Sequence, residues 1–455
     1  MEPARAAERV PNFCFRYLFT FSIEAAGFNL KRSGPSHLVF TSLTFRPDHS
    51  AGLLKGRPGG HPGTVVLTIK TGKAKRANCM NFDFPDELKL LREQANKFLS
   101  DKCGSEVPRK ILESDLAYDE GLWKQMADMG WIGVTVPEEY GGSGLGHLAA
   151  CMLAEEIGYR LAPVPFSSTV YLAIEAILLF GSDAQKQKYL PDLASGQAIA
   201  TFAAAEKPGA FDPGRVKARV RDGMLYGTKV SVPDGNSANF AVVVASSGED
   251  QGPWLHIVDL NQKGVSRESI KCIDPSRPHV RIVIDGAEAD PLDSAKGPLD
   301  VRRLIDRAAV MMAFEQVGGA QAALDMAKDF ALDRYAFGRP IGSFQAIKHK
   351  LADLYVAIEL ARSNAYYGAW ALHTESAELP LAAAVARISA SDAGWQTTKE
   401  NIQTHGGIGY TWDGDCHLNY RRAALLGLTL GGKSEWKRRL ARELKARNIT
   451  AAQTA

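Results

Sequence analysis

The spacing of apolar residues changes twice along this chain, and that change most constrains its fold. Between residues 84 and 195 apolar side chains recur every three or four positions, as in Leu88, Leu91 and Ala95, which is typical of helices. Short β-branched runs replace this pattern between residues 198 and 287, and helical spacing returns from residue 299. We therefore predict an α+β fold that is mainly α, with a β-domain between two helical sections.

The middle section contains short apolar runs separated by Asp-Gly, Gly-Asn and Gly-Glu turn signals. Such runs predict an antiparallel sheet or a small barrel. The predicted strands are residues 229–232, 240–244, 255–258 and 279–284.

Long apolar-periodic segments dominate the last section and predict a C-terminal four-helix bundle. The predicted helices are residues 308–330, 345–372, 380–405 and 436–446. The expected domains are an N-terminal helical domain at 81–196, the β-domain at 197–297, the bundle at 298–447 and a tail at 448–455.

Composition excludes several classes of protein. No apolar run reaches the roughly 20 residues that a membrane-spanning helix needs. The six cysteines show no CxxC spacing, which argues against a metal site or a disulfide framework and fits a reducing compartment. We expect a bacterial cytoplasmic protein that binds no metal, with a mitochondrial location as the alternative.

The first eighty residues differ from the remainder in charge. They hold twelve basic and four acidic residues and are rich in Gly, Pro and Ser. Glu2, Glu8 and Glu24 argue against a transit peptide, and the scattered basic residues argue against a nucleic-acid-binding arm. We interpret residues 1–80 as a disordered or non-native extension, with Met80 as the natural start, and prefer this interpretation to a targeting signal.

Two motifs in the last section indicate a nucleotide site. The first begins with Arg334, continues through a Phe337-Gly338 pair and ends at Gln345, where the backbone must turn between two helices. An arginine beside glycine backbone is suited to holding a pyrophosphate.

The second motif runs Gln-Thr-His-Gly-Gly from Gln403 to Gly407. Its paired glycines, Gly406 and Gly407, would let a ligand approach the main chain closely, and the Gln403 amide could bond hydroxyl or phosphate oxygens.

In their order and wording these motifs resemble the acyl-CoA dehydrogenase family. Further similar stretches are Met129-Gly130-Trp131 with the glycine-rich turn after it, and Gly181-Ser182-Asp183 with the helix after it. The resemblance covers about residues 81–442. It implies FAD-dependent oxidation of acyl-CoA thioesters to 2-enoyl-CoA, with an electron-transfer flavoprotein or similar acceptor. It also implies a homo- or hetero-oligomer, a dimer or tetramer, because FAD in this family lies between protomers; no nucleic-acid partner is expected.

The same resemblance assigns roles to individual residues. Arg334 would pair with the FAD pyrophosphate, Phe337 and Phe344 would pack about the adenosine half, and Gln345 would hydrogen-bond it. Gln403, Gly406 and Gly407 would close around the pyrophosphate of a flavin bound mainly by a neighbouring subunit.

The β-section departs from the family pattern. The loop that contacts the flavin ring usually reads Thr-Glu-Pro, whereas this chain has Ala205-Glu206-Lys207-Pro208. Lys229 and Ser231 belong to the segment where a Trp-Ile-Thr commonly stacks by the ring. Flavin binding is expected to be weaker on this side.

The catalytic base is the main departure. Counting from Tyr420-Arg421 places Leu430 where the family's glutamate is usual, and the second family position falls on Ala308 or Ala309. The base is therefore unassigned.

Other residues were weighed for the role of base. Glu315 is a weak candidate that is more simply a buried glutamate satisfied at a helix interface. Asp306 is expected to precede the helix and cap it, Asp413 and Asp415 to be loop residues, and His405 to be a packing or cofactor-shell residue.

These departures resemble the shorter subunits of heteromeric acyl-CoA dehydrogenases, in which a partner supplies the base. The expected function is FAD-dependent α,β-dehydrogenation of an acyl-CoA thioester to 2-enoyl-CoA, either by this chain itself or as one subunit of a heteromer whose sister chain supplies the base. The alternative is a non-catalytic structural or FAD-binding subunit of such a complex.

Overall fold

The computed structural model describes residues 31–32, 38–39, 85–208, 211–247 and 254–454. The chain divides into two units, Met1–Met80 and Asn81–Ala455. In the first unit, β1 (Lys31–Arg32) pairs antiparallel with β2 (Leu38–Val39). Our interpretation of residues 1–80 as a disordered or non-native extension otherwise falls on residues outside the described part of the chain.

The second unit begins with helices, as predicted. Two of them have clear starting signals. Asp119 accepts a hydrogen bond from the Leu122 amide at the start of α4, and Ser182 forms a reciprocal capping box with Gln185 at the start of α7. The elements are α2 (Asp86–Lys102), α3 (Glu106–Leu112), α4 (Glu120–Asp128), the 3-10 turn η1 (Glu138–Tyr140), α5 (Gly146–Tyr159), the π-helix η2 (Ser167–Ile174), α6 (Glu175–Phe180) and α7 (Asp183–Ala194).

Strands follow, and each of the four predicted strands lies within an observed one. Strands β3, β4, β8 and β10 were not predicted; β8 is largely exposed and polar, so it lacks the alternation that marks a half-buried strand. The elements are β3 (Ala200–Ala203), η3 (Pro213–Arg215), β4 (Arg219–Arg221), β5 (Met224–Pro233), β6 (Phe240–Val244), β7 (Leu255–Asp259), β8 (Val265–Ile270), β9 (His279–Glu288) and β10 (Asp290–Pro291).

The strands form two four-stranded sheets, in the orders β4-β5-β9-β8 and β10-β7-β6-β3. The first sheet is antiparallel throughout, as predicted, but β3 and β6 in the second sheet are parallel. The chain leaves β3, forms β4 and β5 in the other sheet, and returns to β6. Such a crossover allows parallel pairing that a tight hairpin cannot give.

The C-terminal section contains the bundle, and the four predicted helices lie within α8, α9, α10 and α12. Helix α11 was not predicted, because buried polar residues such as Asn419 and Arg422 interrupt its apolar pattern. The elements are α8 (Pro298–Asp333), β11 (Tyr335–Ala336), β12 (Arg339–Pro340), η4 (Ile341–Ser343), α9 (Gln345–His373), α10 (Leu379–His405), η5 (Ile408–Tyr410), α11 (Cys416–Leu428) and α12 (Lys433–Thr454). None of the helices in the described segments is long and apolar enough to cross a membrane.

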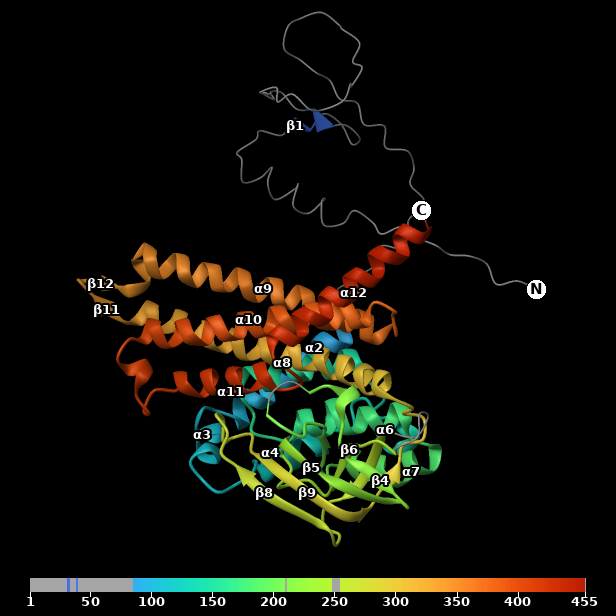
Figure 1. Cartoon of the computed structure of the whole chain (residues 1–455). Coiled ribbons are helices and arrows are strands. Elements are labelled where there is room, and N and C mark those ends of the chain that lie inside the picture. The colour runs from blue at the N-terminus through green and yellow to red at the C-terminus, as the bar shows by residue number, and fades with distance from the viewer. Residues whose placement is uncertain (1–30, 33–37, 40–84, 209–210, 248–253, 455) are drawn as a thin grey trace, which may run out of the picture. The chain divides into compact units, whose positions relative to one another are not determined.

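Helix α8 is the central element of the second unit. In Figure 1 the bundle helices run side by side, with the strands and most of the N-terminal helices below them, and α8 lies between these layers. Its first half is buried on all sides, from Leu304 to Gly318, because it packs on α5, η2, α9, α10 and α11. A helix segment that is buried all round belongs in the interior of a large protein, and its charged residues, such as Asp306 and Glu315, need partners there.

Two glycines allow α5 and α8 to touch backbone to backbone. A Cβ at Gly158 would lie 1.9 Å from the carbonyl oxygen of Glu315, and a Cβ at Gly318 would lie 1.9 Å from that of Glu155. Neither backbone can yield to such a contact without separating the helices. The close approach of α5 to α8 therefore depends on both glycines.

We predict that Gly318→Ala lowers the free energy of unfolding by about 1 to 3 kcal/mol, because the new methyl group overpacks the helix contact. Gly319→Ala is the matched control, since its Cβ would meet only an ordinary contact at 3.5 Å. That change should be neutral or should stabilise the helix by up to about 1 kcal/mol. Urea denaturation of both variants checks this; equal stability of the two would contradict the assigned contact.

Candidate functional site

The first predicted motif forms the connection between α8 and α9. Arg334 follows the last residue of α8, and its carbonyl oxygen accepts a hydrogen bond from the Ile341 amide at 2.8 Å. Between them β11 and β12 form a hairpin that turns at Phe337 and Gly338, both with positive φ. The Arg334 side chain is exposed and makes no ion pair within the described segments.

Aromatic and cationic side chains gather around this hairpin. Phe337 is 95% exposed and meets Phe344 edge-on, with ring centroids 6.2 Å apart. The Arg339 guanidinium lies 4.0 Å above the Phe344 ring. Gln345 opens α9 with an exposed side chain. A ring as exposed as Phe337 offers a stacking surface to a ligand or a second chain.

The second motif ends α10 with open backbone. Gln403 is exposed in the last turn of the helix, and Gly406 has φ +61°, a conformation that side chains rarely adopt. A Cβ built at Gly406 or Gly407 meets no atom within 4 Å. The chain itself therefore leaves the space beside these glycines free for a ligand.

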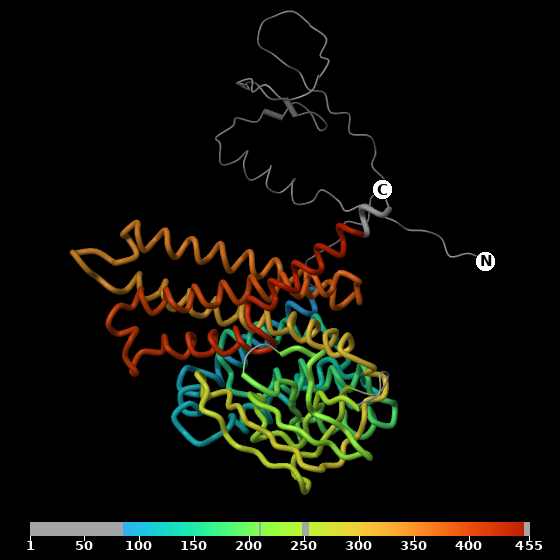
Figure 2. The backbone as a smooth tube through the Cα atoms, viewed as in Figure 1, coloured from blue at the N-terminus to red at the C-terminus, as the bar shows by residue number. Residues whose placement is uncertain are grey.

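A ring contact holds the ends of α8 and α10 together. The rings of Phe330 and His405 stack with centroids 4.1 Å apart, and His405 Nδ1 lies 2.9 Å from the Asn401 carbonyl oxygen. His405 is thus used in packing. Figure 2 shows that the α8–α9 and α10–α11 connections lie at the same end of the bundle. The structure therefore brings both motifs to one end, although about sixty residues separate them.

These groups suit one half of FAD. An unpaired Arg334, open glycine backbone at Gly406 and Gly407, and an exposed aromatic ring at Phe337 are what a pyrophosphate and an adenosine require. The remaining requirement is a site for the flavin ring.

The loop expected to contact the ring is instead tied into its own domain. The Lys229 ammonium donates to the Glu206 carboxylate at 2.9 Å and to the Ala204 carbonyl oxygen at 3.1 Å. The same carboxylate accepts from the amides of Lys217 and Ala218. The residues that replace the family's flavin-contacting groups therefore bind one another, and they do not fit the ring.

Burial and charge set the protonation of this ion pair. Lys229 is fully buried, and burial lowers its pKa to about 8, even though Glu206 acts in the opposite direction. Burial also opposes the charge on Glu206, but the Ala218 amide and the Lys229 ammonium outweigh it and lower the pKa of that carboxyl. The pair is thus charged near neutral pH.

Both usual positions of the base hold apolar side chains. Leu430 lies between α11 and α12 with φ +63° and packs against the core. Ala308 and Ala309 are fully buried in α8. None of these side chains can accept a proton.

Glu315 is held between arginines from two other sections of the unit. Its Oε1 lies 3.4 Å from Arg277 Nη1 and 4.0 Å from Arg422 Nη1. Arg277 also pairs with Asp234 at 3.3 Å, and Arg422 pairs with Asp274 at 2.6 Å. This buried network joins α8, α11 and the β-domain, which is the simple structural role expected for Glu315.

Asp306 differs from its expected position. It lies within α8 and not before it, so it caps no helix. Only 3% of it is exposed, and burial raises its pKa to about 7, with Arg439 acting in the opposite direction. Asp415 directly precedes α11, as a loop residue should, and accepts from Arg109 at 2.5 Å; Asp413 is exposed.

Asp306 also lines a cavity of about 470 Å³ that the sequence analysis missed. The cavity lies among the first half of α8, the α9–α10 turn and α12, and five arginines line it. Three of these arginines, Arg302, Arg303 and Arg307, belong to α8. Because Arg303 and Arg307 are four residues apart, the sequence could have predicted a cationic face on this helix. No group of His, Cys, Asp and Glu among the described residues could hold a metal ion.

Comparison with known proteins identifies the family. The acyl-CoA dehydrogenase N-terminal domain matches residues 85–197, and the acyl-CoA dehydrogenase C-terminal domain matches residues 296–444. The acyl-CoA dehydrogenase IpdE2 of Mycobacterium tuberculosis is 33% identical over 362 residues, which cover 79% of this chain and 98% of that protein.

Two solved structures are similar in fold and sequence. A variant of the Tcur3481–Tcur3483 steroid ACAD has a TM-score of 0.72 and 32% identity over 80% of this chain and 99% of that one. The ChsE4–ChsE5 complex from Mycobacterium tuberculosis has a TM-score of 0.74 and 27% identity over the same shares. The chain therefore belongs to the acyl-CoA dehydrogenase family.

Proposed function

We propose that this chain is one subunit of a heteromeric, FAD-dependent enzyme that converts an acyl-CoA thioester to a 2-enoyl-CoA. The observation that carries the proposal is the contrast between the two halves of its flavin site. The pyrophosphate residues at the end of the bundle are exposed and unpaired, whereas the ring loop is closed by Glu206 and Lys229.

This contrast supports a flavin shared with a second chain. Arg334, Phe337 and Gln345 would hold the adenosine and pyrophosphate from the α8–α9 connection, and Gln403, Gly406 and Gly407 would do so from the end of α10. The flavin ring would lie against a partner of the same fold whose own ring loop is open. The similarity to ChsE4–ChsE5, a complex of two chains, supports such a partner.

The chemistry explains why a second chain is needed. When bound, FAD accepts the hydride that leaves the β-carbon of the acyl group. The α-proton must be taken by a positioned base, and the usual positions here are Leu430 and Ala308 or Ala309. The partner would therefore supply the base, and an electron-transfer flavoprotein or similar acceptor would reoxidise the flavin.

A second candidate is a structural subunit that binds the partner and contributes no residue to the flavin site. Two residues favour this structural subunit. Lys229 is fully buried in the segment that usually contacts the flavin ring, and the apolar Leu430 stands at the usual position of the base. The two candidates differ in whether Arg334 affects the flavin of the complex.

We predict that the isolated chain purifies with little FAD, and that the chain co-expressed with its partner carries about one FAD per pair. Arg334→Ala in the complex should lower this ratio on dilution, because a charge-assisted hydrogen bond contributes about 1.5 to 3 kcal/mol. Lys124→Ala, an exposed change on α4, is the control. The ratio of flavin absorbance to protein measures the effect.

An unchanged flavin ratio in Arg334→Ala would favour the structural subunit. Stoichiometric FAD in the isolated chain would contradict the shared site altogether.

We also predict that Glu315→Gln acts on stability and leaves the pH profile of turnover unchanged. Removing one charge from a buried network leaves Arg277 and Arg422 with less compensation and should cost about 3 kcal/mol or more in unfolding free energy. Denaturation and a pH–rate profile of the complex measure the two effects. A profile that loses its low-pH limb in this variant, where protonation of a base stops turnover, would instead identify Glu315 as the base.

A further inference from the structure

The cavity beside α8 has an excess of positive charge. Its wall contains Arg302, Arg303 and Arg307 from α8 and Arg439 and Arg442 from α12. The carboxylates in the same wall are Asp306, Glu375 and Glu443. When every group is ionised, five cations face three anions, and the wall has a net charge of +2.

Three of these arginines already have partners. The Arg307 guanidinium contacts the Glu175 carboxylate and lies 3.9 Å from Glu375. The Arg302 guanidinium lies 3.7 Å from Asp212. These ion pairs hold the guanidinium groups of Arg302 and Arg307 in the cavity wall and partly offset their positive charge.

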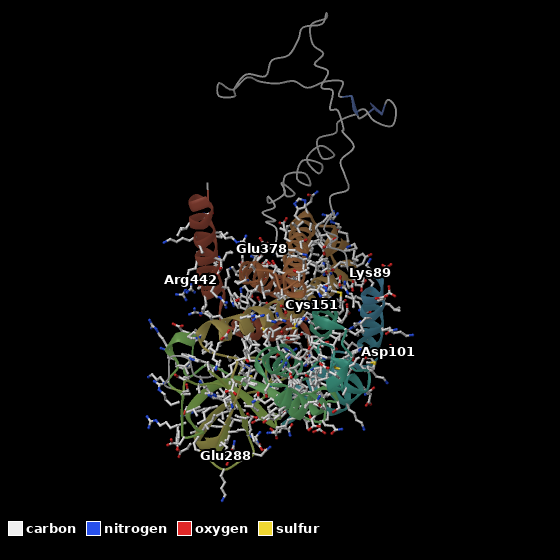
Figure 3. The ribbon with its side chains drawn as sticks, turned by 90° about the vertical axis from the view of Figure 1, so that its right-hand side faces the viewer. Lys89, Asp101, Cys151, Glu288, Glu378 and Arg442 are labelled. Atoms are coloured by element: carbon white, nitrogen blue, oxygen red, sulfur yellow. The ribbon has the colours of Figure 1, made fainter. Side chains whose placement is uncertain are left out.

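The third, Arg439, pairs with the nearly buried Asp306 and also lies over the Trp436 ring, 4.3 Å from its centroid. Contacts on two sides hold this guanidinium in place at the wall. Figure 3 labels Arg442 on α12 and Glu378 at the start of α10. Arg447 of α12 pairs with Glu378 at 3.0 Å, so the helix is fastened to the far side of the cavity.

The remaining two arginines, Arg303 and Arg442, make no ion pair within the described segments. They come from different helices and lie on the same cavity. Two exposed guanidinium groups beside the same partly open cavity can each offer a fork of N–H donors to one group of oxygens. This arrangement suits a small polyanion better than it suits an apolar ligand.

We propose that this cavity binds a phosphomonoester dianion, with Arg303 and Arg442 as its principal ligands. A dianion offers one negative charge to each of the two guanidinium groups that have no ion pair, Arg303 and Arg442, whereas a single carboxylate would leave one of them uncompensated. Three or four acceptor oxygens also match guanidinium donors that approach from two helices. The dianion could come from the 3′-phosphate of coenzyme A or from a free phosphorylated molecule.

The proposal concerns binding and not redox chemistry, so it can be tested apart from the function proposed above. Isothermal titration of the full-length protein with inorganic phosphate, coenzyme A and 3′-dephospho-coenzyme A supplies the measurement. Tighter binding of coenzyme A than of the dephospho form assigns the phosphate to coenzyme A. Equal affinity of the two, together with binding of inorganic phosphate, assigns a free phosphorylated ligand.

The matched variants are Arg303→Gln and Arg442→Gln, with Arg438→Gln as control. Arg438 is exposed on α12 but does not line the cavity, so its change removes the same charge from the same helix. Each cavity variant should weaken binding of the phosphate-bearing ligand at least about tenfold. The control should change it less than about twofold, since a distant exposed charge is screened by salt.

Failure of all three ligands to bind at millimolar concentration would overturn the proposal. An equal loss of binding in Arg438→Gln and in the cavity variants would also overturn it, because only general electrostatic attraction would then remain. Melting temperatures of the variants verify that folding is unchanged.

Asp306 makes the binding dependent on pH. As the pH rises through about 7 its carboxyl loses a proton, adds a negative charge to the wall and attracts Arg439. Arg302, Arg303, Arg307 and Arg442 keep their charge over this range. Affinity for a dianion should therefore fall as the pH rises from 6 to 8.

Sulfate is the ligand with which this pH dependence is measured, because sulfate keeps a charge of −2 between pH 6 and pH 8. Among the carboxylates near the cavity, burial opposes the charge on Glu175, but His147 and Arg307 hold its pKa at about 2, so it stays ionised. Asp306→Asn should bind sulfate with an affinity that is nearly independent of pH. A variant that keeps the pH dependence of the unmodified protein would overturn the role of Asp306.

Discussion

The direct contact between the backbones of α5 and α8 is the constraint on which the rest of the second unit depends. Gly158 and Gly318 bring each helix against a carbonyl oxygen of the other, closer than any side chain would allow. Helix α8 then reaches from the β-domain side of this unit to the hairpin at its far end, and it links the cavity, the buried charge network and the first motif. The cavity lies along its first half, Glu315 at its middle and Arg334 directly after it.

The buried arginine network around Glu315 secures the same helix from the other side. Arg277 comes from the segment before β9 and Arg422 from α11, so three separate parts of the chain share one cluster of charges. Burying charges is costly unless they are paired, so the cluster fixes the relative orientation of these parts more than it adds stability. The ion pairs of Glu315 with Arg277 and Arg422 are those of a structural carboxylate, and whether it also acts as a base stays a prediction to be tested.

The two halves of the flavin site differ in a physically consistent way. At the end of the bundle, cationic and aromatic groups stay exposed and glycine backbone stays uncovered, although no contact among the described residues requires this. In the β-domain, the corresponding loop has formed an internal ion pair between Glu206 and Lys229. The groups at the end of the bundle are exposed and have no partner among the described residues, whereas the loop of the β-domain is occupied by its own ion pair. Both observations support assembly with another subunit.

Local periodicity was enough to predict the class of fold and the four bundle segments, and residue types that few other sites combine were enough to locate the two motifs that we expect to bind the cofactor. The sequence by itself also determined that Leu430, Ala308 and Ala309 cannot act as a base. Tertiary structure alone decided the parallel pairing of β3 with β6, the existence of α11, the position of Asp306 inside a cavity and the pairing of Lys229 with Glu206. Each of these depends on groups far apart in the chain, such as Asp306 with Arg439, and on burial that reverses the ordinary preference of a charged residue for water. A local sequence pattern does not show which distant residues will become neighbours. The arginine-lined cavity is formed by α8, the α9–α10 turn and α12, so it could be recognised only in the folded structure.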